Sequence, residues 1–99
     1  CNDIRNSKSL SLYKLLKRQK KNKIDVYDPI VDKNILFKNH KILIKEKLKK
    51  NYYDAIIIAV PHKAIKKFSI NYLKSLGNKK LTIIDLKSIF PKKLVQWQL

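Results

Sequence analysis

Residues 53–62 read Tyr-Asp-Ala-Ile-Ile-Ile-Ala-Val-Pro-His, a long and mostly apolar run without a lysine or an arginine. Asp54 precedes the apolar residues, and Pro61 ends them. A short apolar run with a polar start and a proline at its end is typical of a strand buried on both faces. Such strands lie in the middle of parallel sheets, between layers of helices. The run therefore predicts a central strand over residues 53–60.

Weaker patterns on both sides of this strand predict further helices and strands. A helix is expected from Ser7 to about Lys17, because leucines recur there at helical spacing, whereas residues 1–6 are expected to form a loop. Gly77, the single glycine, stands where a helix C-cap would be. The other expected elements are short strands at 24–27 and 41–44, a loop or irregular helix at 30–40, a helix or loop at 46–51, a short helical face at 64–68, a helix at 70–76, a turn at 78–80, a strand at 81–84, and a tail at 91–99 that forms a strand or helix packed by Trp97.

The order of these elements predicts an α/β fold. Helices that alternate with strands imply crossover connections and a parallel sheet. We expect a single three-layer, Rossmann-like domain over residues 1–99, with a mainly parallel sheet flanked by helices. Because the chain opens close to a helix, a strand is expected before Cys1, and the domain is expected to lack this first strand.

The composition excludes several classes of protein. An apolar fraction of 44% is ordinary for a folded domain. No run reaches the roughly 20 apolar residues of a membrane span, and the start has no signal-peptide core. The single cysteine, Cys1, excludes an intramolecular disulfide and fits a reducing compartment. These features predict a soluble, cytoplasmic protein without a membrane partner.

A formal net charge of +17 raises the question of nucleic-acid binding. Of the 24 basic residues, only Arg5 and Arg18 are arginines, and the lysines are spread along the whole chain. Phosphate and base recognition favours arginine for its planar fork. A nucleic-acid partner is therefore the less favoured interpretation, and composition bias on solvated faces is the more economical one.

Candidate binding residues follow from the expected topology. In open α/β sheets, ligands bind beyond the carboxyl ends of the strands. The residues that follow the expected strands, or precede the first helix, are Asp28, His62, Asp85 with Lys87, and Asp3 with Arg5. They carry the charges that suit a phosphate and ribose hydroxyls, so they are expected to line a crevice.

No catalytic or metal-binding constellation appears among these residues. One glycine excludes a glycine-rich phosphate loop. His40, His62 and Cys1 are the only histidines and cysteine, and their spacing does not match a metal site. The residues alone therefore predict a binding or supporting domain.

Four motifs occur together in order: Asp-Ile-Arg-Asn-Ser-Lys at 3–8, Val-Tyr-Asp-Pro at 26–29, the run at 53–62, and Asp-Leu-Lys at 85–87. In this arrangement the chain resembles the C-terminal, UDP-binding domain of the UDP-glucose/GDP-mannose dehydrogenase family. The first and last motifs are similar in particular to those of bacterial UDP-N-acetylhexosamine 6-dehydrogenases of surface-polysaccharide synthesis.

The resemblance implies a part in a larger enzyme. Family members use NAD⁺ to oxidise the C6 hydroxyl of a nucleotide sugar to a carboxylate. An N-terminal domain binds most of the NAD, a helical middle domain forms a homodimer, and the C-terminal domain closes over the nucleotide. The catalytic cysteine belongs to the parts absent here, so Cys1 is not expected to be the nucleophile, and these 99 residues alone are expected to be inactive.

Two site residues are carried over from the resemblance. Arg5 matches the arginine that reaches towards the NAD, and Lys87 matches a basic residue that contacts the UDP-sugar. From the residues alone, Arg5 would rather pair with Asp3, Lys87 would be one more solvated lysine, and His62 would begin a turn. Two alternatives to the family interpretation stay open, a small basic module that binds nucleic acid or an acidic partner, and a purely structural domain.

Overall fold

The structure is a computed structural model that describes residues 2–29, 33–60, 63, 65 and 67–99. In the helices it describes side chains from Lys8 onward, except those of Ile35 and Leu36. The chain divides into two compact units, Cys1–Lys47 (unit 1) and Leu48–Leu99 (unit 2), and each has its own buried residues. The predictions for Pro61, His62 and Ala64 lie outside the described residues.

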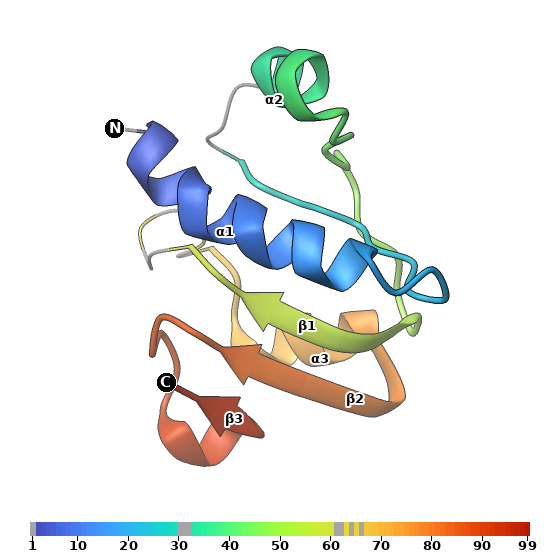
Figure 1. The fold of residues 1–99 in the computed structure, drawn as a ribbon. Coiled ribbons are helices and arrows are strands. Elements are labelled where there is room, and N and C mark those ends of the chain that lie inside the picture. Colours follow the sequence, from blue (N-terminus) through green and yellow to red (C-terminus); the bar gives the residue numbers. More distant parts are fainter. Residues whose placement is uncertain (1, 30–32, 61–62, 64, 66) are drawn as a thin grey trace. The chain divides into compact units, whose positions relative to one another are not determined.

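Unit 1 begins with helix α1, Asn2–Lys17 (Figure 1). The expected loop at residues 1–6 is wrong from residue 2 onward, since no proline or glycine interrupts the helix there and Arg5 lies within it. At the other end, the side-chain Nδ2 of Asn22 donates to the carbonyl oxygen of Leu16 at 2.9 Å. Asn22 therefore satisfies a terminal carbonyl group where no glycine is present.

Two extended segments of unit 1 pair through one parallel bridge, Val26 to Ile44. Ile42 and Ile44 are 3% and 6% exposed while Leu43 is 67% exposed, which is the alternation of a strand. The strands predicted at 24–27 and 41–44 are thus reduced to a single bridge. Pro29 follows shortly after and lacks an N–H group, so it cannot donate a bond to a neighbouring strand.

Helix α2, Lys33–His40, occupies the segment that was expected to be a loop or irregular helix. It ends at His40, and the next residue, Lys41, has a φ of 58°, in the left-handed region. The Lys41 N–H donates to the carbonyl of Phe37 at 2.9 Å, which closes the last turn. An exposed ion pair joins Lys33 to Glu46 at 3.0 Å and contributes little to stability.

Unit 2 is a parallel sheet of three strands with the order β1-β2-β3. The strands are β1 (Tyr53–Ile58), β2 (Gly77–Asp85) and β3 (Trp97–Gln98). Helix α3, Ile70–Leu76, connects β1 to β2 and lies behind the sheet in Figure 1. A short 3-10 helix, Lys92–Leu94, precedes β3. Parallel strands with helices confirm the predicted Rossmann-like α/β fold.

The predicted central place of the apolar strand is wrong. The tail adds β3 on the far side of β2, so β2 is the middle strand of the described sheet. Within β1, Asp54 and Ala55 are exposed, and only Ile58 is fully buried. The isoleucine run predicted that β1 would be buried on both faces. Burial is instead confined to the end of the strand.

The prediction for α3 is confirmed in detail, whereas β2 already begins at Gly77, before the predicted strand at 81–84. Helix α3 has the predicted bounds, and Leu73 and Leu76 are 3% and 1% exposed in the core of unit 2. The turn predicted at 78–80 is wrong, because these residues lie within β2, where the Asn78 Oδ1 accepts from the Lys80 N–H at 2.8 Å. The pairing with β1 shifts register at this point.

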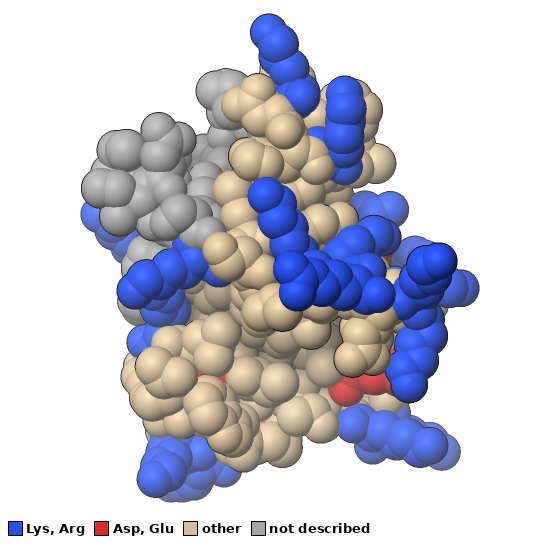
Figure 2. All heavy atoms as spheres, in the orientation of Figure 1, with Lys and Arg blue, Asp and Glu red and all other residues tan. Residues whose placement is uncertain are grey.

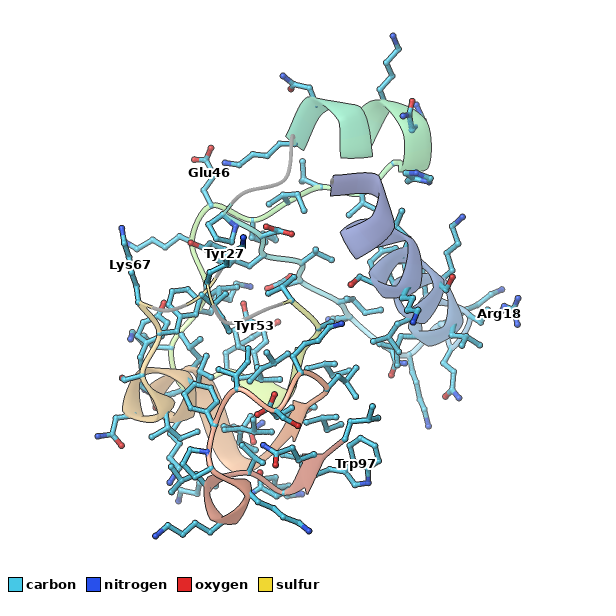
Figure 3. All side chains as sticks on the ribbon, turned by 90° about the vertical axis from the view of Figure 1, so that its left-hand side faces the viewer. Arg18, Tyr27, Glu46, Tyr53, Lys67 and Trp97 are labelled. Carbon is cyan, nitrogen blue, oxygen red and sulfur yellow. The ribbon has the colours of Figure 1, made fainter. Side chains whose placement is uncertain are left out.

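Trp97 does not pack the tail as expected, because it is 51% exposed and projects outward from β3 (Figure 3). Among the described residues, no helix is both long enough and apolar enough to cross a membrane.

Candidate functional site

The carboxyl ends of β1 and β2 meet at one edge of the sheet. Ile58, the last residue of β1, is the register partner of Asp85, the last residue of β2. The Leu86 N–H donates to the Ile58 carbonyl at 2.9 Å, directly after the paired strands. Residues 86–90, here named the β2 loop, therefore begin where ligands bind in open parallel sheets.

Asp85 organises the β2 loop from a fully buried position. Its side chain is 0% exposed. Its Oδ2 accepts from the Phe90 N–H at 2.9 Å, and its Oδ1 accepts from the Lys87 N–H at 3.3 Å. A buried carboxylate of this kind needs such donors, because an unpaired buried charge is strongly unfavourable. The loop folds around Asp85 so that its N–H groups point inward.

The electrostatics of Asp85 follow from these contacts. Burial raises the pKa of the Asp85 carboxyl group. Hydrogen bonds lower the pKa by more than burial raises it, so the pKa lies below its ordinary value of 3.8; the donors are the backbone N–H groups of Phe90, Ile89 and Lys87 and the side chain of Gln98. Asp85 is therefore a negative charge held inside the protein at neutral pH.

Lys87 lies on the β2 loop with an exposed side chain. Its backbone N–H is turned towards Asp85, and no described residue forms an ion pair with its ammonium group. The next residue, Ser88, has a φ of 51°, a left-handed conformation that is unfavourable for a residue with a side chain. The β2 loop, whose backbone is held by hydrogen bonds to Asp85, thus presents the Lys87 ammonium group to solvent.

The remaining predicted residues are distributed differently. Arg5 lies in α1 of unit 1, and its side chain is outside the description. Asp28, also in unit 1, is 7% exposed, so its carboxylate is withdrawn from solvent. His62 is not among the described residues. Within unit 2 the structure brings Asp85 and Lys87 together, and the ligand roles of all five residues stay predictions.

Two residues of this site were missed from the sequence, Ser88 and Gln98. The Gln98 Nε2 donates to Asp85 Oδ2 at 3.0 Å and to the Phe90 carbonyl at 2.6 Å. No motif or periodicity marks Gln98, because its partners are distant in sequence and depend on the pairing of β3 with β2. The positive φ of Ser88 also has no sequence signal, since glycine or asparagine would be expected there.

The sequence of each unit carries lysines along its whole length. Figure 2 shows Lys and Arg side chains in blue, with other described residues between them in tan. Some of them lie over aromatic rings in unit 2. The Lys49 and Lys50 ammonium groups are each 4.3 Å from a ring centroid, those of Tyr52 and Tyr72 respectively. These rings are covered by lysines of the same unit, which reduces their use as stacking surfaces for bases.

Comparisons with known proteins identify the family of the chain. The family model described as UDP-glucose/GDP-mannose dehydrogenase family, UDP binding domain, matches residues 1–92. A curated relative, the UDP-N-acetyl-D-glucosamine 6-dehydrogenase of Salmonella typhi, is 33% identical over 91 residues. The alignment covers 92% of this chain and 21% of the relative, so the chain spans about a fifth of that protein's length. No solved structure matches.

Proposed function

Because the chain belongs to the UDP-glucose/GDP-mannose dehydrogenase family, as its UDP-binding domain, we propose that it forms the nucleotide-binding surface of an NAD-dependent UDP-sugar 6-dehydrogenase. The substrate would be a UDP-hexose or a UDP-N-acetylhexosamine, and the product the corresponding UDP-uronic acid. The name of the Salmonella relative favours UDP-N-acetylglucosamine among these.

The observation that carries this proposal is the exposed Lys87 on a loop fixed by the buried Asp85. The N–H groups of Lys87 and Phe90 are directed at Asp85, so they are not available to bind a phosphate. Recognition of the diphosphate by this loop would therefore depend on the Lys87 ammonium group. A lysine acts as a point charge and lacks the two-pronged geometry of arginine, so we expect it to contact phosphate oxygens singly.

Arg5 would serve the cofactor side. This role comes from the resemblance of residues 3–8 to the family motif, and the structure adds that the residue belongs to helix α1. A guanidinium group keeps its charge at any pH in the physiological range, which suits contact with the pyrophosphate of NAD. When bound, NAD⁺ would supply the acceptor for the hydride from C6 of the sugar.

The oxidation would consume two NAD⁺ and one water for each alcohol converted to a carboxylate, and it would release two NADH and three protons. The nucleophile that carries the intermediate and most of the NAD contacts would come from the domains outside these residues. Closure of the UDP-binding domain would position the substrate and exclude bulk water. Two copies of the complete protein would associate through the middle domain.

The proposal is tested on the complete protein that contains this chain. UDP-N-acetylglucosamine and NAD⁺ are added, and the absorbance of NADH is followed, with UDP-glucose as the comparison substrate. We expect NADH formation with at least one UDP-sugar, two NADH for each sugar consumed, and competitive inhibition by free UDP. Absence of NADH with every UDP-hexose, together with no competition or binding by UDP, would refute the proposal.

A further inference from the structure

The C-terminal residues are bonded to both ends of the β2 loop. The Gln98 Nε2 donates to the Asp85 carboxylate at 3.0 Å and to the Phe90 carbonyl at 2.6 Å. The Leu99 N–H donates to the Asp85 carbonyl at 3.3 Å, and the Leu99 carbonyl accepts from the Ser88 hydroxyl at 2.8 Å. We name these four contacts the C-terminal latch.

The latch surrounds Lys87 in sequence and in space. Asp85 lies before it, and Ser88 and Phe90 lie after it, so the loop cannot shift while all three are held. Ser88, whose hydroxyl group makes one of these contacts, has a left-handed φ of 51°. A side-chain-bearing residue keeps such a conformation only where its surroundings determine it, and such positions are frequent at ligand clamps.

The two residues that hold the loop in the latch, Gln98 and Leu99, lie outside the residues matched to the family. The family model ends at residue 92, whereas β3 is Trp97–Gln98. The loop motif at 85–87 is inside the matched region. Gln98 and Leu99, which are bonded to the loop, come after the matched region in the sequence. The match to the family therefore does not account for Gln98.

We propose that Gln98 is a positioning residue for UDP recognition, which holds the β2 loop in the conformation that presents Lys87 to the diphosphate. This inference rests on the proposed function and deepens it. Gln98 suits the role because its amide group has two N–H donors, one for the carboxylate and one for the carbonyl. With the loop released, only a fraction of molecules would present Lys87, and the apparent affinity would fall by that fraction.

The test is a double-mutant cycle on the complete protein, with UDP titrations followed by calorimetry. Gln98→Met keeps the length of the side chain and removes both donors. If about one molecule in ten then presents Lys87, UDP binds about tenfold more weakly. In the Lys87→Ala background, Gln98→Met is expected to cause little further loss, because Gln98 acts through Lys87.

Gln96→Met is the matched control. Gln96 is the residue before β3, and its Oε1 accepts from the Ile83 N–H at 2.7 Å, so this variant removes a side-chain bond between the tail and β2 without touching the loop. Its UDP affinity is expected to stay within about twofold of the parent. Equal weakening by Gln96→Met and Gln98→Met would show a general effect of destabilising the tail, and would overturn the inference.

A second signature is the pH profile of Gln98→Glu. This variant places a second carboxylate against Asp85, and the two negative charges repel each other at high pH. At lower pH one of the two groups takes up a proton, and the repulsion is removed. Relative to Gln98→Met, its UDP affinity is expected to recover as the pH is lowered from 8 to about 5. Parallel profiles for the two variants would contradict the contact between Gln98 and Asp85.

The outcomes separate the two proposals. If Lys87→Ala leaves UDP binding unchanged, the nucleotide role of the loop fails, and the inference fails with it. If Lys87→Ala weakens binding but Gln98→Met does not, or if their effects are additive, only the inference fails. If Gln98→Met prevents folding, Ser88→Ala is used in its place, because it removes the contact between the Ser88 hydroxyl and the Leu99 carbonyl. We expect it to weaken UDP binding about threefold, and to have no further effect in the Lys87→Ala background.

Discussion

The amide of Gln98 and the carboxylate of Asp85 lie 3.0 Å apart, although 13 positions separate them in sequence. The contact joins the edge strand β3 to the end of the central strand β2. The same carboxylate accepts from the Phe90 N–H at 2.9 Å. One buried charge therefore links the pairing of the last strand to the shape of the loop that carries Lys87.

Replacing Asp85 by asparagine should destabilise unit 2. In the parent, N–H groups donate to both oxygens of the Asp85 carboxylate. Asparagine replaces one of these oxygens by an NH₂ group, so at least one buried N–H donor loses its acceptor. We expect a loss of about 1–3 kcal/mol in the free energy of unfolding, measured by urea denaturation. Asp54→Asn is the control, because Asp54 is exposed on β1 and bonded to Asn78. Similar losses for the two variants would contradict the role given to Asp85.

The lowered pKa of Asp85 predicts how stability depends on pH. The unfolded chain, with the ordinary pKa of 3.8, takes up the proton before the folded state does. The stabilisation from Asp85 is therefore complete well above that value, and is lost as the pH falls through it towards the lower pKa of the folded state. The difference in unfolding free energy between the parent and Asp85→Asn should shrink over this range. A difference that stays constant or grows in acid would oppose the assignment.

Gly77 is required for space, not for an unusual backbone. Its φ is −87°, which any residue can adopt. A methyl group at this position would overlap the side chain of Leu81, including its fixed Cβ atom. We expect Gly77→Ala to cost about 1–3 kcal/mol, seen as a lower melting temperature. Lys79→Ala, at an exposed position of the same strand, is the control and should be nearly neutral. An equally neutral Gly77→Ala would show that the overlap is easily relieved.

Ser69 caps helix α3. Its hydroxyl oxygen accepts from the Tyr72 N–H at 3.0 Å, at a helix end that has no acidic residue in its first turn. Ser69→Ala should cost about 0.5–2 kcal/mol in chemical denaturation, whereas Ser69→Asp keeps an acceptor and should preserve stability. If both variants lost the same amount, the cap would not be the source of the effect.

Local patterns in the sequence predicted the elements whose cause is local. The bounds of α3 followed from the spacing of Leu73 and Leu76, which both lie in the core. The turn expected at 78–80 was wrong, because β2 already pairs with β1 at Gly77 and includes these residues. Gly77 was correctly placed at the end of α3, but for a different reason, since its backbone is extended. The early start of α1 had no such local signal, because nothing in residues 2–6 marks a cap more clearly than Ser7.

Features that depend on distant pairing could not be predicted in this way. The central strand changed from β1 to β2 because the tail pairs with β2, and the tail carries no strong strand pattern. Lys87 could be chosen among 22 lysines only through its place after a strand and its family motif. Gln98 could not be chosen at all, because its partners are set by the register of Asp85 against the tail.

The central claim is that the β2 loop binds the diphosphate of UDP through Lys87. The most direct measurement is a calorimetric titration of UDP into the complete protein, for the parent, Lys87→Ala and Lys93→Ala. Lys93 is the control, an exposed lysine in the 3-10 helix of the same unit. The loss of one charged hydrogen bond predicts a dissociation constant about ten- to a hundredfold higher for Lys87→Ala, and no change for Lys93→Ala. Equal affinities for all three proteins would contradict the claim.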